Sequence, residues 1–156
     1  MDENIYNERF NAYVEKTFDL EKIERFPGQV KILPNGKEFK MRAHQSKGVL
    51  RSLQNSTLLA HDVGSGKTIT MVTAAMEMRR LKLAKKPMIV VQNATVDQFA
   101  STFKMIYPQS KVLIPTKKDR EAKNRKRLLA KIAFNDWDAV VIPQSFLDFI
   151  QDDPLR

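Results

Sequence analysis

Short continuous apolar runs alternate with amphipathic stretches along most of this chain. The apolar runs at residues 57–60, 88–91, 111–114 and 139–142 predict strands. Apolar residues at helical spacing predict helices at 42–53, 67–83, 96–106, 116–134 and 145–150. The almost wholly apolar run at 88–91 is typical of a strand that is buried on both faces of a parallel sheet. Strands that alternate with helices indicate an α/β fold in which helices flank a parallel sheet.

The first 38 residues differ from this pattern and are predicted to form an extension. Apolar residues at roughly helical spacing predict a helix from about residue 7 to 24, which Pro27-Gly28 ends. Pro34-Asn35-Gly36 stands between apolar residues and predicts a short hairpin over residues 30–41. We therefore expect an N-terminal extension at 1–38 and an α/β domain at 39–156.

The composition narrows the classes of protein that fit this pattern. With 156 residues the chain has room for one domain, and an apolar share of 42% is ordinary for a protein with a core. Cysteine is absent, which excludes disulfides and thiolate metal sites, and His44 and His61 are the only imidazoles. The formal charge of +9 favours a polyanionic partner such as nucleic acid, although a well-solvated surface is the alternative.

No segment predicts export or insertion into a membrane. Residues 1–6 are polar and acidic, without the basic and apolar segments that export requires. No apolar run approaches the ~20 residues that span a bilayer. We expect a cytoplasmic protein with no membrane partner, and a monomer by default.

The segment after the first predicted strand has the residues of a phosphate-binding loop. It reads His61-Asp62-Val63-Gly64-Ser65-Gly66-Lys67-Thr68 and leads into a predicted helix. Glycines at 64 and 66 let backbone N–H groups approach phosphate oxygens, and the helix adds its dipole. Lys67 would reach the outer phosphates, and the Thr68 hydroxyl would be a ligand of Mg²⁺. ATP and Mg²⁺ are the expected cofactors, bound by Gly64, Ser65, Gly66, Lys67 and Thr68.

One position departs from the full pattern GxxxxGK[ST], which asks for glycine where this chain has His61. We interpret His61 as a loop residue rather than a catalytic base or a metal ligand. The alternative for the whole segment is a chance Gly-Ser-Gly turn. The order of strand, turn and helix counts against that alternative.

These residues resemble the first motif of superfamily-two helicases, especially the Swi/Snf-like and DEAD/DEAH-type ATPases, in which a polar residue commonly replaces the first glycine. The resemblance covers about residues 39–150 and implies a partial RecA-like P-loop domain, the first helicase lobe. Arg42-Ala43-His44-Gln45 resembles the family's adenine-reading element, which implies that Gln45 hydrogen-bonds the base. Residues 60–64, 115–119 and 124–127 are similar to large helicase and DNA-methyltransferase fusion proteins of phages and conjugative elements, which implies a mobile-element origin.

The same resemblance implies a surface for nucleic acid. Residues 89–94 with 96–99, and residues 138–146, resemble segments that such motors place against the nucleic-acid backbone, which brings in Gln92 and Asn93. The predicted helix at 116–134 is strongly basic, and its cations would contact phosphates without reading sequence. These cations are Lys117, Lys118, Arg120, Lys123, Arg125, Lys126 and Arg127, with Ala122, Leu129, Ile132 and Ala133 as the expected buried stripe. A solvated helix that only aids solubility is the alternative, and DNA is expected over RNA.

The departures from the family bear on catalysis. The chain has no Asp-Glu-x-His or Asp-Glu-x-Asp tetrapeptide, and its adjacent acidic pairs are Asp2-Glu3 and Asp152-Asp153. The family's hydrolytic carboxylates are therefore missing, as is a second lobe with its arginine finger. We expect the ATP-binding fragment of a DNA-dependent helicase or translocase, with no complete catalytic set of its own. The alternatives are a stand-alone nucleotide- or nucleic-acid-binding module and, less compatible with these residues, a metabolic P-loop kinase.

Two aromatic residues could either stack on a nucleic-acid or nucleotide base or pack within the protein. Trp137 adjoins a predicted turn, and such a residue more often packs its ring against the edge of the sheet. Phe39 stands just before the Gln45 element and could stack on adenine. For both residues we predict packing.

Overall fold

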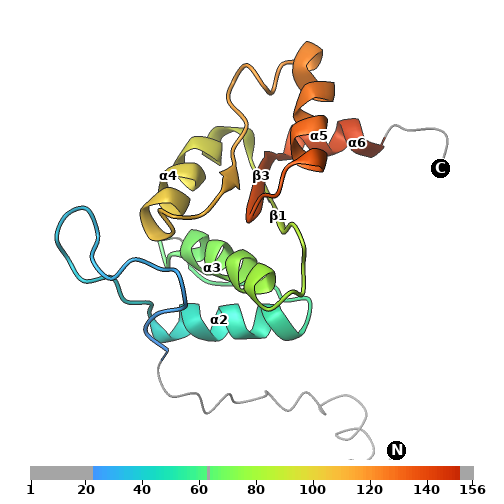
Figure 1. The fold of residues 1–156 in the computed structure, drawn as a ribbon. Coiled ribbons are helices and arrows are strands. Elements are labelled where there is room, and N and C mark those ends of the chain that lie inside the picture. Colours follow the sequence, from blue (N-terminus) through green and yellow to red (C-terminus); the bar gives the residue numbers. More distant parts are fainter. Residues whose placement is uncertain (1–22, 63, 152–156) are drawn as a thin grey trace, which may run out of the picture.

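The computed structural model describes residues 23–62 and 64–151, which form an α/β fold with a three-stranded parallel sheet flanked by helices (Figure 1). The strands are β1 (Met88–Val91), β2 (Val112–Leu113) and β3 (Ala139–Pro143), in the spatial order β1-β3-β2. The predicted α/β class and parallel sheet are thereby confirmed. The helix predicted at about residues 7–24 lies almost wholly outside the described residues.

The central strand β3 separates two layers of helices. Every residue of β3 is buried, and successive side chains of a strand point to opposite faces. Val141 belongs to the hydrophobic cluster that includes residues of α3 (Lys67–Arg80) and α4 (Val96–Ile106). Val140 and Ile142 belong to a second cluster, with residues of α5 (Arg125–Phe134) and α6 (Gln144–Gln151). Figure 1 shows α4 on one side of β3 and α5 with α6 on the other.

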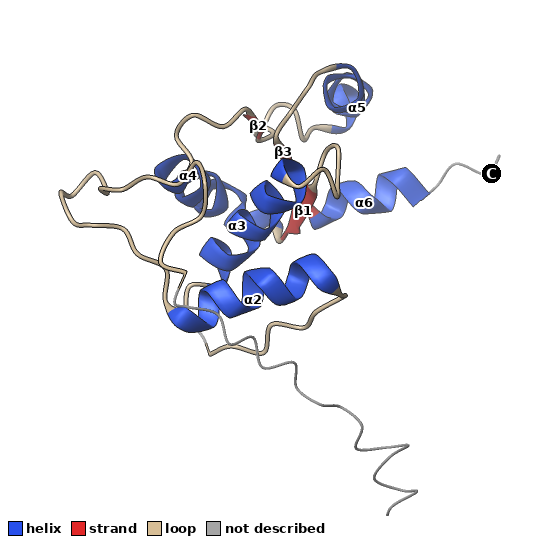
Figure 2. Ribbon diagram, turned by 60° about the horizontal axis from the view of Figure 1, so that its bottom comes forward, coloured by secondary structure: helices blue, strands red, loops and turns tan. Residues whose placement is uncertain are grey.

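Helix α2 (Ala43–Gln54) packs on α3 and runs beside it (Figure 2). Gly48 permits this close contact, because a Cβ at that position would lie 3.0 Å from Thr70 Cγ2. Ahead of α2, Phe26 and Phe39 are buried in the same cluster as residues of α3 and α4. The predicted hairpin at 30–41 forms with a single antiparallel bridge between Ile32 and Glu38.

Some predicted elements have the predicted bounds, whereas one predicted strand does not form. The strand at 88–91 and the helix at 96–106 have the predicted bounds. Residues 57–60 do not form the predicted strand, and Leu58 is 90% exposed. A strand requires a hydrogen-bonded neighbour, and the three described strands pair only with one another. Burial alternates along β1, with Met88 and Val90 43% and 37% exposed on one face and Ile89 and Val91 buried on the other, so one face of this strand is only partly covered, contrary to the expected burial on both faces.

The basic helix begins later than predicted. Asp119 Oδ2 accepts hydrogen bonds from the Thr116 N–H at 3.0 Å and from its hydroxyl at 2.7 Å, as in a capping box. The chain then makes a turn and the short 3₁₀ helix η2 (Ala122–Asn124) before α5 begins. Leu128 is the buried side chain of α5. Ala122 lies in η2, outside this helix, and Ala133, five residues after Leu128, falls on a different face at 3.6 residues per turn. The predicted stripe is wrong for Ala122 and Ala133, which are exposed, whereas Leu129 and Ile132 are partly buried.

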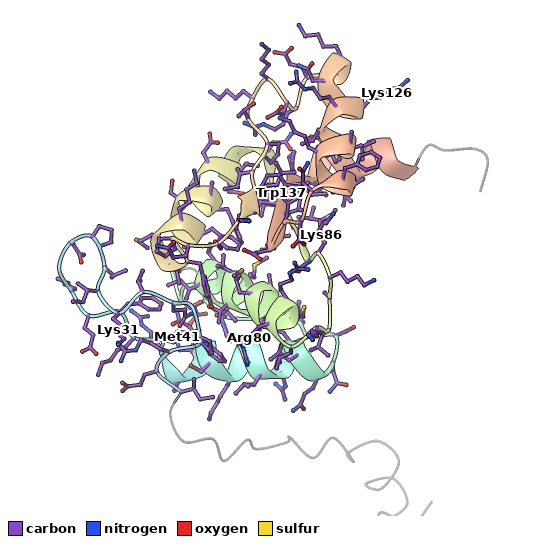
Figure 3. The ribbon with its side chains drawn as sticks, viewed as in Figure 1. Lys31, Met41, Arg80, Lys86, Lys126 and Trp137 are labelled. Carbon is purple, nitrogen blue, oxygen red and sulfur yellow. The ribbon has the colours of Figure 1, made fainter. Side chains whose placement is uncertain are left out.

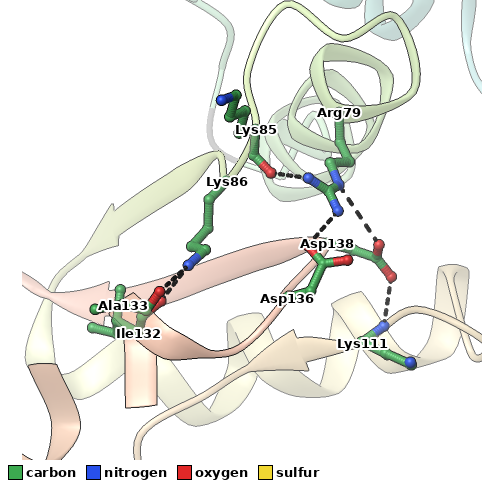
Figure 4. Close-up of polar contacts among 8 residues, drawn as sticks. All are labelled: Arg79, Lys85, Lys86, Lys111, Ile132, Ala133, Asp136 and Asp138. Atoms are coloured by element: carbon green, nitrogen blue, oxygen red, sulfur yellow. Dashed lines mark hydrogen bonds and ion pairs between the residues drawn. The ribbon is translucent and has the colours of Figure 1, made fainter. Parts of the chain in front are cut away.

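A polar corner joins the C-terminal end of α3 to the start of β3 (Figure 4). Arg79 ion-pairs with Asp136 at 2.6 Å, lies 3.9 Å from Asp138, and donates a hydrogen bond to the Lys85 carbonyl. The second oxygen of Asp138 accepts the Lys111 N–H at 2.8 Å. Arg79 and the two aspartates therefore fix α3 against the residues that lead into β2 and β3.

Lys86 makes the matching connection to the C-terminal end of α5. Its Nζ donates to the Ile132 carbonyl and, at 3.2 Å, to the Ala133 carbonyl (Figure 4). A cation at the last carbonyls of a helix also interacts favourably with the helix dipole. No helix in the described part of the chain is long and apolar enough to cross a membrane.

Candidate functional site

The glycine loop, which we define as residues 61–68, follows residues 57–60 and includes the first two residues of α3. Gly64 and Gly66 have φ angles of +82° and +83°, a region that glycine enters without steric cost. Gly66 is the N-cap of α3, and no side chain caps this helix end. The first N–H groups of a helix have no partners within the helix. The loop therefore brings free backbone donors and the positive end of the α3 dipole to one place.

Lys67 folds back over this loop. Its Nζ donates to the carbonyl oxygens of His61 at 2.6 Å and Asp62 at 3.2 Å. Both acceptors are neutral carbonyl oxygens of the glycine loop, so these two contacts do not neutralise the charge of the ammonium group. A bound anion could replace these carbonyls as the partner of Lys67 at a modest cost in free energy, because the lysine would lose one hydrogen bond and gain another.

Helix α2 contacts the glycine loop through two successive side chains. His44 Nε2 and Gln45 Nε2 each lie 3.0 Å from the Ser65 carbonyl oxygen. Gln45 is 4% exposed, and its Oε1 accepts the Arg42 N–H at 2.9 Å. Gln45 Nε2 also lies 3.5 Å from the Gly66 carbonyl oxygen, so both protons of this nitrogen face carbonyls of the glycine loop. The Gln45 oxygen retains a second lone pair that could accept a further hydrogen bond.

A cavity of about 280 Å³ opens where α2 meets the glycine loop. Its lining includes Phe39, Arg42, Gln45 and Met105 in addition to the loop glycines. Phe39 is 5% exposed and packs in the core, so the prediction of packing is confirmed, and the residue also lines this cavity. The cavity therefore offers an apolar wall and a buried amide beside the loop.

Two buried polar atoms of the loop have no hydrogen-bond partner within the described residues. They are His61 Nδ1 and Ser65 Oγ. Buried polar groups are normally paired, so such atoms indicate a position that a ligand or water completes. Thr68 is partly buried in the first turn of α3. Residues 23–62 and 64–151 contain no group of three or more His, Asp or Glu side chains that could hold a metal ion.

A second polar group gathers where β1 and β3 end. Gln92 and Asn93 follow β1 and are exposed. Asn93 Oδ1 accepts the Ser145 hydroxyl at 3.0 Å, and its carbonyl accepts from Arg120 Nη1 at 3.5 Å. The carboxyl ends of parallel strands meet at one edge of a sheet, which places these three segments together. The structure thus brings Gln92, Asn93 and Arg120 near one another.

The other predicted cations are distributed over the turn and α5. Lys117, Lys118, Lys126 and Arg127 are exposed, and Lys126 projects outward from α5 (Figure 3). Lys123 ion-pairs with Glu121 at 3.2 Å. Arg125 is partly buried and takes part in an interaction of its own. The predicted continuous basic helix is therefore a basic turn followed by a basic helix.

Trp137 packs as predicted. Its ring is partly buried against the cluster that contains Leu128 and Phe146, and its Nε1 donates to the Lys131 carbonyl at 2.8 Å (Figure 3). A ring that has both its apolar surface and its donor engaged in this way is part of the fold.

The chain belongs to the family described as "Probable helicase domain", which it matches over residues 50–153, about two thirds of its length. The matched part contains the glycine loop, all three strands and the basic segment. It begins within α2 and so leaves out His44 and Gln45. A search of curated proteins gives no match.

The sequence did not predict the contacts of His44 with the glycine loop or of Ser145 with Asn93. From the sequence, His44 stands out only as one of two imidazoles and as part of the element that contains Gln45, and Ser145 has no individual role. Their partners, Ser65 and Asn93, are distant in sequence, and only the position of His44 next to Gln45 at the start of a helix was a usable signal.

Proposed function

We propose that this helicase domain binds ATP with Mg²⁺ at the glycine loop. The observation that carries the proposal is the loop itself, in which two glycines with positive φ lead into the uncapped helix α3 beside Lys67. Backbone donors, a helix dipole and a lysine together match the charge and the acceptors of a polyphosphate. The Ser65 hydroxyl, which has no partner among the described residues, and the open space beside Gly64 also fit a ligand in close approach.

The cavity beside α2 could hold the base of the same nucleotide. Gln45 and Arg42 supply polar groups, and Phe39 and Met105 supply apolar surface. We propose that the second lone pair of the Gln45 amide oxygen accepts a hydrogen bond from the edge of adenine. Thr68 would hold Mg²⁺ through its hydroxyl, with phosphate oxygens and water as the other ligands. Mg²⁺ would supply charge neutralisation at the outer phosphates.

We further propose that the domain serves an ATP-dependent motor that moves on DNA. Support comes from the helicase family, the net charge of +9, and the exposed cations at 117–127 beside the polar edge at Asn93. Phosphate contacts by lysine and arginine give affinity that does not depend on sequence. The chain contains no Asp-Glu-x-His tetrapeptide, so we expect it to bind ATP with little or no turnover by itself.

Calorimetric titration with ATP and Mg²⁺ tests the proposal. The wild type should bind, and Lys67→Ala should weaken binding by roughly tenfold or more, because a charge-assisted contact is lost. Lys104→Ala removes an exposed lysine from α4 and is the matched control, with binding expected to be unchanged. Thermal unfolding of all three proteins separates ligand effects from misfolding.

Two outcomes would contradict the proposal. Absence of ATP binding by the folded wild type, or equal binding by Lys67→Ala, would show that the loop is not a nucleotide site. A hydrolysis assay with and without DNA belongs in the same series. Robust turnover would mean that the chain has a catalytic carboxylate outside an Asp-Glu-x-His tetrapeptide.

A further inference from the structure

His44 and Gln45 direct their donors at one atom, the carbonyl oxygen of Ser65. Both N···O distances are 3.0 Å. Because a carbonyl can only accept, His44 Nε2 must carry the proton of this bond. An oxygen with two lone pairs is thereby saturated by two consecutive residues of α2. The residue whose carbonyl is held lies between the two glycines of the loop.

Holding this carbonyl determines where the next amide points. The peptide unit is planar and trans, so the Ser65 C=O and the Gly66 N–H point in opposite directions. With the oxygen fixed toward α2, the Gly66 N–H is directed away from α2. Gly66 is the N-cap of α3, and its N–H is among the donors that would meet a phosphate.

His44 also contacts the first residue of the glycine loop. The rings of His44 and His61 are 5.1 Å apart, with an interplanar angle of 86°, an edge-to-face arrangement. The His61 carbonyl in turn accepts from Lys67 Nζ at 2.6 Å. One side chain of α2 therefore touches the loop at its beginning, by ring contact, and at its fifth residue, by hydrogen bond.

We propose that His44 is a positioning residue for the polyphosphate part of the ligand, which acts through the loop and makes no contact with the nucleotide. The inference rests on the proposed nucleotide function. It assigns His44 a role different from that of Gln45, since a residue that orients backbone donors affects every nucleoside triphosphate equally. A residue that reads the base changes the preference between ATP and GTP.

The test uses His44→Met, which keeps a similar volume without a donor, and His44→Gln, which restores an amide donor. Calorimetry with Mg-ATP and with Mg-GTP should show that His44→Met weakens both by a similar factor, roughly fivefold for one hydrogen bond. His44→Gln should recover most of the affinity. Lys47→Met, at an exposed position of the same helix, is the control and should bind as the wild type does.

A measurement without nucleotide keeps the inference separate from the proposed function. Amide hydrogen exchange at Ser65, Ile69 and Thr70, whose N–H groups bond to the Asp62 and Gly66 carbonyls, should be faster in His44→Met than in the wild type, and His44→Gln should restore the protection. If the wild type binds no nucleotide, the proposed function fails, and the exchange result alone then decides whether His44 orders the loop.

The inference is overturned by either of two results. Equal triphosphate affinity and equal exchange in His44→Met and wild type would show that the bond to Ser65 orders nothing. A loss for ATP but not for GTP would assign His44 to the base. If His44→Met does not fold, His44→Gln and the wild type are compared, and a fivefold loss despite the retained donor would likewise reject the hydrogen-bond role.

Discussion

Gln45 occupies the space that a side chain at Gly66 would need. A Cβ at residue 66 would lie 2.2 Å from Gln45 Nε2, far inside van der Waals contact. Gly66 also has a φ of +83°, so two independent requirements select glycine here. Gly64 has nearly the same φ, +82°, but a Cβ there would meet no atom within 4 Å. Backbone conformation alone therefore selects glycine at position 64, whereas both backbone conformation and the contact with Gln45 select it at position 66.

Gly64→Ala and Gly66→Ala should differ in their effects on stability. Each pays about 1 kcal/mol for the left-handed backbone, and only Gly66→Ala must also displace Gln45 from Ser65. We expect a larger fall in the free energy of unfolding, measured in urea, for Gly66→Ala. Equal losses would show that the Gln45 contact is not retained in solution. Adding Gln45→Ala to Gly66→Ala should relieve the steric part of the loss.

Asp119 should make stability depend on pH in the acid range. The hydroxyl of Thr116, followed by its backbone N–H, lowers the pKa of Asp119 from its ordinary 3.8 to about 2. Because the folded-state pKa is the lower one, the ionised carboxylate stabilises the fold above about pH 4. That contribution is lost as the pH falls from about 4 toward 2.

Asp119→Asn should therefore be less stable than the wild type at pH 6, with a difference that shrinks below pH 4. Urea unfolding at pH 6, 4 and 3 measures this difference. Thr116→Val removes the hydroxyl donor but keeps the carboxylate, and it should reproduce part of the effect in the same pH window. A difference that stays constant with pH would contradict the assignment to this hydrogen bond.

The exposed cations of α5 should contribute to DNA binding through phosphate contacts. Replacing Lys126 and Arg127 by serine should weaken binding of a single-stranded oligonucleotide, measured by fluorescence anisotropy. The slope of log K against log salt should decrease by roughly 0.7 for each lost contact. Lys31→Ser with Lys37→Ser removes the same charge from the hairpin and is the control. Equal effects of the two double variants would indicate net charge alone and no localised surface.

Trp137 should matter for stability and not for nucleic acid. Trp137→Phe keeps an aromatic ring but loses the donor to the Lys131 carbonyl, which is expected to cost about 1 kcal/mol. Circular dichroism is the suitable probe, since Trp137 is the chain's single tryptophan. A loss of DNA affinity with unchanged stability would instead assign the ring to base stacking.

Local chemistry made several features predictable from the sequence alone. The apolar strand at 88–91 and the amphipathic helix at 96–106 have the bounds that their patterns predict. The glycines at 64 and 66 have positive φ angles, as the Gly-Ser-Gly-Lys sequence indicates. These features depend on side-chain periodicity and on backbone freedom, which are properties of neighbouring residues.

Other features depend on partners that are distant in the chain, and only the tertiary structure decided them. Residues 57–60 are apolar enough for a strand but have no hydrogen-bonded neighbour among the described strands. Thr116 and Asp119 make their capping bonds without starting a helix, and the packing of Leu128 accompanies a start at Arg125. The sequence by itself therefore determined the bounds of β1 and α4 and the positive φ angles of Gly64 and Gly66. Only the packing of α2 on α3 brings His44 and Gln45 to Ser65, because these residues are 21 and 20 positions away from Ser65 in the sequence.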